Sequence, residues 1–114
     1  MGTGCLTKIH DGGLKDQVIA VLYRQCDGYP EGHGIELERF LKDKKVVNGI
    51  SHDDKEKGNF NGPGCLAASI VAHFKKEIGG FYLCPTNSKD WDERYIYHVY
   101  VKDGKPLVRM EVEG

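Results

Sequence analysis

Apolar and β-branched residues near the N-terminus predict two strands that pair as a hairpin. Segments 6–10 and 17–25 flank Asp11-Gly12-Gly13, which supplies the positive φ angles of a tight turn. The second segment alternates Ile19, Val21 and Tyr23 with Ala20 and Leu22, so neither of its faces is strongly polar before its end. We therefore expect segment 17–25 to lie inside a sheet.

The middle of the chain changes to helical spacing. From Ile35 onward, Leu37, Phe40 and Leu41 follow i, i+3, i+4 spacing and predict a short amphipathic helix. Segment 64–78 predicts a longer helix, with one apolar stripe and a glycine pair at its C-terminal end. The stripe consists of Leu66, Ile70, Phe74 and Ile78. Between the helices we expect a brief strand at 46–50 and a solvated loop at 51–58.

Strands return after the second helix. Segment 81–84 predicts a strand that ends at Pro85, and segments 95–102 and 107–112 predict a second hairpin. The order is ββα(β)αβββ. It predicts an α+β fold in which two helices cover one face of an antiparallel or mixed sheet of about five strands. At 114 residues the chain is expected to form a single domain, 1–114.

Charge and composition narrow the classes of partner. Sixteen basic residues against 17 acidic residues give a net charge of -1, which argues against binding of extended nucleic acid. Apolar runs fall short of the ~20 residues of a membrane span, and the N-terminus lacks the pattern of a secretion signal. We expect a cytoplasmic protein that needs no cofactor. The cysteines form no C-x2-C pair, so reduced and mostly buried thiols are expected at Cys5, Cys26, Cys65 and Cys84.

Both predicted helices follow glycine-rich loops, which are the candidate binding site. Glycines let backbone N–H groups approach a ligand, and a helix N-terminus favours an anion. Turn formation alone is the other interpretation of these residues. The candidates in the first loop are Asp27, Gly28, Tyr29, Gly32, His33 and Gly34, and those in the second are Phe60, Asn61, Gly62 and Gly64.

Two further side chains suit the same kind of ligand. Arg24 ends the second strand and suits a phosphate, or else forms a structural pair with Asp27. Trp91 suits stacking on an aromatic ring of a ligand, or else it caps the core. Tyr29 and Phe60 likewise suit stacking on a base.

No established catalytic signature is present. Cys26 with His33 lacks the context of a thiol catalyst, and His73 and His98 are expected to be structural. The run His52-Asp53-Asp54 lacks further metal ligands at fitting positions, so we expect it to be a charged loop.

Several short motifs resemble a set of small, functionally uncharacterised proteins of tailed phages and prophages. They are Met1-Gly2-Thr3, Tyr23-Arg24-Gln25, Asp27-Gly28-Tyr29-Pro30, Gly32-His33-Gly34, Gly64-Cys65-Leu66-Ala67-Ala68 and Gly79-Gly80-Phe81-Tyr82. The resemblance spans nearly the whole chain. Gly4 and Cys26 depart from it, since a basic and an aromatic residue are common at those positions. The resemblance implies a phage accessory protein, and such proteins often counter host defence.

The leading hypothesis is noncatalytic capture of a small phosphate-bearing, nucleotide-derived ligand by a homodimer. Such a protein would act as a sponge for a host immune signal. A shared site requires the two glycine loops to converge, as helices packed in parallel would allow. The alternatives are a small phosphodiesterase or nucleotide hydrolase that uses His33 or His98, and a protein–protein inhibitor of a host defence enzyme.

Overall fold

The computed structural model describes residues 2–88 and 91–112, which form an α+β fold built on a five-stranded mixed sheet. The strands of this sheet are β1 (Gly4–His10), β2 (Val18–Arg24), β5 (Phe81–Cys84), β6 (Glu93–Lys102) and β7 (Lys105–Val112). The helices are α1 (Ile35–Leu41), α2 (His52–Lys57) and α3 (Gly62–Phe74), and a π-helical turn, Pro30–Gly34, leads into α1. The predicted fold class is confirmed.

The strand order is β5-β2-β1-β6-β7, with β1 at the centre. Both predicted hairpins form, since β1 pairs antiparallel with β2 and β6 pairs antiparallel with β7. The two hairpins join through parallel pairing of β1 with β6, which makes the sheet mixed. Strand β2 lies between β1 and β5, as its two apolar faces predicted.

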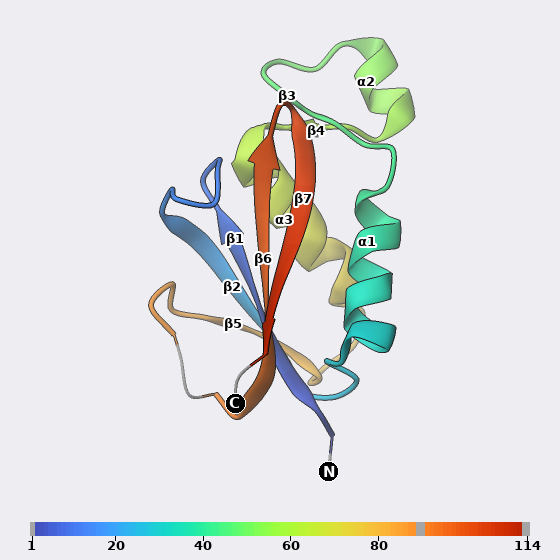
Figure 1. Ribbon diagram of the computed structural model, residues 1–114. Helices are drawn as coiled ribbons and strands as arrows, with labels where there is room; N and C mark the ends of the chain where they lie inside the picture. The colour runs from blue at the N-terminus through green and yellow to red at the C-terminus, as the bar shows by residue number, and fades with distance from the viewer. Residues whose placement is uncertain (1, 89–90, 113–114) are drawn as a thin grey trace.

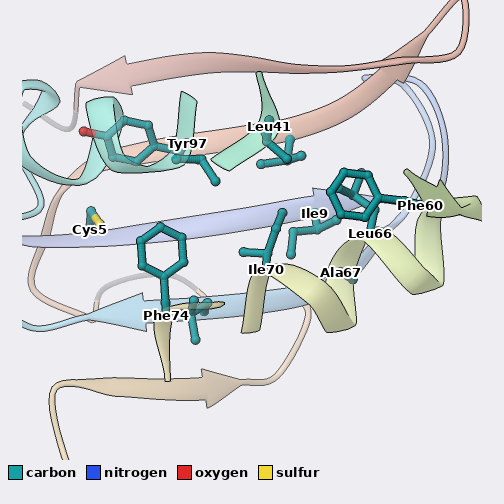
Figure 2. Packing of buried hydrophobic residues seen from close by; sticks show 12 residues of the cluster. Cys5, Ile9, Leu41, Phe60, Leu66, Ala67, Ile70, Phe74 and Tyr97 are labelled. Atoms are coloured by element: carbon teal, nitrogen blue, oxygen red, sulfur yellow. The ribbon is translucent and has the colours of Figure 1, made fainter. Parts of the chain in front are cut away.

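Helices α1 and α3 pack against one face of the sheet (Figure 1). Successive residues of a strand point to opposite faces, so alternate positions of β1 and β6 supply the core. Cys5, Ile9 and Val99 are fully buried there, in one apolar cluster with Leu66 and Ile70 of α3. Figure 2 shows Ile9 toward the Leu66 end of this cluster and Cys5 toward the Tyr97 end. A smaller apolar cluster of Leu6, Val21 and Ile96 lies on the opposite face.

A second, two-stranded sheet joins the ends of the two helices. Strand β3 (Val46–Val47) leaves α1 and pairs in parallel with β4 (Phe60–Asn61), which leads into α3. The prediction of a solvated loop at 51–58 is wrong, because α2 forms there. Ser51 and Asp54 make a reciprocal capping box at its start, and no residue of α2 is buried. A helix held by its cap and surface ion pairs shows no apolar stripe in the sequence.

Helix α3 ends at Phe74, four residues before the predicted end. Lys75 leaves the helix with an extended backbone, and its ammonium group donates to the carbonyls of Gly79 and Phe81. Ile78 therefore does not join the apolar stripe and is fully exposed. Within the described residues, no helix has the length and apolarity to cross a membrane.

Candidate functional site

The glycines of the first loop are required by packing. A Cβ at Gly28 would lie 2.8 Å from Cys5 Cβ, and one at Gly32 would lie 2.6 Å from the carbonyl oxygen of Asp27. A Cβ at Gly34 would lie 3.3 Å from the Tyr97 ring. A side chain would clash at Gly28 and Gly32 and would crowd the Tyr97 ring at Gly34, so packing explains these glycines without a ligand.

The backbone donors of this loop already have partners inside the chain. Gly28 N–H donates to Thr3 O, and His33 N–H donates to Asp27 O. Gly32 N–H donates to the carbonyl of Tyr29, and the Tyr29 residue is exposed. The Tyr29 hydroxyl donates to the exposed Asp27 carboxylate, which would repel an anion. These amides therefore do not form the predicted anion site.

His33 is a buried structural residue. Its side chain is fully buried, and its Nε2 lies 2.7 Å from the hydroxyl of Thr7. Arg24 Nη1 donates to Nδ1 over 3.3 Å, which requires Nδ1 to carry the lone pair and Nε2 the proton. Burial first and the Arg24 charge second lower the pKa of His33 to about 3. His33 is thus neutral and shielded from solvent, which does not suit an acid–base catalyst.

Arg24 pairs with a different residue from the one considered in the sequence. Its guanidinium forms an ion pair with Glu36 of α1 and donates to the carbonyl of Cys26 over 2.7 Å. It also lies 5.0 Å from the centroid of the Phe81 ring. The expected Arg24–Asp27 pair is not the one that forms, and Arg24 links β2 to α1 and β5.

The second loop is not a companion site. Phe60 is 3% exposed, so it belongs to the core and cannot stack on a ligand. Asn61 accepts a hydrogen bond from Gly49 N–H, and Gly62 has φ +83° in open space. Gly64 is exposed with no heavy atom near its missing Cβ.

The two loops lie at opposite ends of α1, so the shared-site arrangement is wrong. The first loop leads into α1, whereas the second follows β4, which pairs with the strand that leaves α1. Figure 1 shows α1 and α3 running in opposite directions. The Phe74 ring at the end of α3 accordingly lies 4.8 Å from the His33 ring. Antiparallel helices place their N-termini at opposite edges.

Trp91 lies on the other face of the sheet from Arg24. Its ring centroid is 5.5 Å from that of Tyr23, and Tyr23 precedes Arg24 in β2. Neighbouring strand residues point to opposite faces, so Tyr23 and Arg24 diverge. Trp91 is 38% exposed, but it does not lie near Arg24, the residue predicted to bind phosphate.

Basic side chains instead converge on a groove of about 600 Å³ between α1, the end of α3 and β5. The volume lies within the range of small-molecule sites. Its basic residues are Arg24, Arg39, Lys44 and Lys76, and its one carboxylate belongs to Glu36. The side chains of Arg39 and Lys76 make no hydrogen bond or ion pair with another residue in the described part of the chain. Their charges are thus available to a ligand.

Aromatic rings form the wall of this groove. The rings of Phe40 and His73 stack with centroids 4.2 Å apart, and Phe81 lines the groove beneath Arg24. Partial burial, with the nearby charge of Lys76, lowers the pKa of His73. His73 is therefore an uncharged, exposed ring at neutral pH. Cationic groups beside aromatic rings suit an anion that carries a flat ring system.

Of the predicted site residues, only Arg24 lies in this groove. Arg39, Lys44 and Lys76 come from helix ends that look solvated in the sequence. The spacing of Arg39 and His73 on their helices gives no signal, because the groove forms only when α1 and α3 pack antiparallel. Phe40 is aromatic, but its helical spacing in the sequence indicates a core position rather than a binding site.

A pair of histidines lies on the open face of the sheet. His10 Nδ1 bonds the carbonyl of Asp16, and His10 Nε2 lies 2.9 Å from His98 Nδ1. His98 Nε2 in turn pairs with Glu111. Because all ring nitrogens are engaged, this cluster explains His98 as a cross-strand structural residue, as expected from the sequence.

The four cysteines and the acidic residues of α2 do not line the groove. All four thiols are free, but only Cys5 is buried, so the expectation of mostly buried thiols is wrong for Cys26, Cys65 and Cys84. Burial raises the pKa of Cys5 to about 12, which keeps it protonated. His52 and Asp53 pair with Glu56 and Lys57 along α2. The described residues contain no group of three or more potential metal ligands.

Comparison with protein-family models, with curated proteins and with solved structures found no match for this chain.

Proposed function

We propose that this chain is a noncatalytic binding protein that captures a small phosphate-bearing, nucleotide-derived ligand in the groove between α1, α3 and β5. The observation that carries the proposal is the convergence of four basic side chains and a stacked Phe40–His73 pair around about 600 Å³. Arg39 and Lys76 hold the phosphate, and the aromatic wall contacts the base. The glycine loops support the fold rather than the ligand.

The charge balance of the groove supports an anion. Arg24 is already paired with Glu36, so Arg39, Lys44 and Lys76 supply the net positive charge. Lys44 donates to the carbonyl of Phe40 and its ammonium lies 5.0 Å from the Phe40 ring, which fixes a charge beside the aromatic wall. A phosphate accepts several charge-assisted hydrogen bonds at such a place.

The resemblance to small phage proteins supplies the biological setting of the proposal. A protein that binds a nucleotide signal without altering it would lower the free concentration of that signal in the host cell. The cytoplasmic location and the counter-defence role stay predictions. A protein–protein inhibitor has no comparable single observation in its favour.

Calorimetric titration with a panel of cyclic and linear nucleotides tests the function. We expect binding that weakens with added salt, and we expect Lys76→Ala to weaken it about 10-fold or more, since a hydrogen bond to a charged group contributes about 1.5–3 kcal/mol. Lys55→Ala in α2 is the matched control, because it removes an exposed charge remote from the groove.

Two results contradict the proposal. Absence of heat with every nucleotide, for a folded sample, eliminates nucleotide capture. Recovery of chemically altered nucleotide after denaturing the complex shows an enzyme instead, and the His98–Glu111 pair is then the group to substitute first.

A further inference from the structure

Strand β7 is an edge of the five-stranded sheet and borders a second groove. This groove measures about 790 Å³ and lies between β7 and α1. Its lining includes apolar residues of both elements, with Ile35 and Leu41 of α1 and Pro106 and Val108 of β7. Natural proteins cover or block such edges, because an open strand offers its backbone to another chain.

The register shows which backbone groups of β7 are open. Asp103 and Gly104 form a two-residue turn with positive φ at both positions, which makes Lys102 and Lys105 a hydrogen-bonded pair. Bonded and non-bonded pairs then alternate along an antiparallel ladder. The N–H and C=O groups of Val108 and Met110 therefore point away from β6. Pro106 occupies the same kind of position, where no N–H is needed by β6.

Charge is ordered along this edge. The hairpin end of the groove carries Lys42, Lys45 and Lys105 together with Asp43, so it is basic on balance, whereas Glu111 stands at the other end of β7 with its side chain 59% exposed. An antiparallel neighbour with the same sequence reverses this order, so each basic end meets an acidic end. The edge is complementary to itself.

We propose that β7 pairs antiparallel with β7 of a second copy, joining two five-stranded sheets across a two-fold axis at Val108. In this register Lys105 lies opposite Glu111 of the second copy, and Pro106 lies opposite Met110 of the second copy. The Lys105–Glu111 pair occurs twice by symmetry. Pairing centred on Arg109 would instead place two arginines opposite each other, which is unfavourable.

The two grooves share Arg39 of α1 and Lys44, which follows α1, but no residue of β7 lines the nucleotide groove, so the pairing of β7 is tested separately from nucleotide binding. A failed nucleotide titration therefore says nothing about the dimer, and a monomeric protein says nothing about nucleotide binding.

Sedimentation equilibrium on the full chain tests the interface. We expect a mass twice the 12.8 kDa of one chain. Lys105→Glu and Glu111→Lys each place like charges opposite each other twice, so each variant alone is expected to be monomeric at the concentration where the parent is dimeric. An equimolar mixture of the two variants is expected to dimerise, because both pairs in the mixed dimer are again opposite in charge.

The controls separate the interface from folding. Lys55→Glu makes the same charge change on α2 and should leave the dimer intact. Val108→Pro removes an outward N–H without touching the β6 ladder, so it should give a monomer with an unchanged circular dichroism spectrum. A parent protein that stays monomeric, or a charge-swapped mixture that does not dimerise although both variants are folded, overturns the proposal. Capture of an acidic peptide by a monomeric parent would assign the edge to another partner and likewise overturn it.

Discussion

At the residue scale, the motif His33-Gly34 shows how a feature that suggests chemistry can serve packing. Glycine, histidine and aromatic residues occur together in the first loop because the loop lies against β1 and β6. Tyr97 donates to Gly28 O over 2.7 Å, and His33 fills the space beneath Phe74. The sequence reveals the residue types but not their burial, since burial depends on strands far away in the chain.

His33 makes stability depend on pH. Its pKa is about 3 in the folded protein against an ordinary 6.5, so the unfolded chain binds the extra proton first as pH falls. Stability is therefore fully present above pH 6.5 and declines toward pH 3, by at most about 1.4 kcal/mol per pH unit within that window.

Urea unfolding at several pH values measures this dependence. His33→Gln removes the titrating group, so the difference between parent and variant isolates it from the carboxylates. Identical pH slopes for parent and variant between pH 6.5 and pH 4 would show that His33 is accessible to protons in the folded state.

Gly28 and Gly64 form a matched pair of substitutions. Gly28→Ala drives a methyl group against Cys5 and the backbone of Gly4, and we expect a loss of about 1–3 kcal/mol of stability. Gly64→Ala meets no atom in the first turn of α3 and should be neutral or stabilising by about 0.4–1 kcal/mol. Thermal unfolding compares the two, and equal effects would contradict a packing role for Gly28.

At the element scale, the strands were predictable and the helix boundaries were less so. Turn sequences and alternation located both hairpins, because they depend on neighbours in the chain. The end of α3 depends on Lys75 binding carbonyls of the following turn, and the existence of α2 depends on one capping box. Neither produces an apolar period.

Helix α2 is expected to open independently of the rest of the fold. Ser51→Ala removes the side chain that accepts from Asp54 N–H, and an N-cap contributes about 1 kcal/mol. Since no residue of α2 is buried, this loss should be local.

Amide hydrogen exchange distinguishes local from global effects of Ser51→Ala. Exchange should speed up within residues 54–58, and the global unfolding midpoint should not move. Lys55→Ala, which leaves the cap intact, is the control. A lowered global midpoint for Ser51→Ala alone would show that α2 unfolds together with the sheet.

At the scale of the whole molecule, the candidate site could not be predicted because it is assembled from elements that only the fold brings together. Arg39 comes from α1, Lys76 follows α3 and Phe81 begins β5. Each looks like an ordinary solvated or core position in the sequence. The antiparallel packing of the two helices moves the basic side chains together and separates the two glycine loops.

The central position of β1 also has a consequence for synthesis. Its partner on one side, β2, follows at once, but its partner on the other side, β6, follows only after all three helices and β5. Until then, one edge of the most buried strand stays unpaired, and the nascent chain cannot complete its sheet. The sheet can therefore be completed only after β6 has been made, and a message truncated before β6 is expected to yield a product that aggregates rather than a smaller domain.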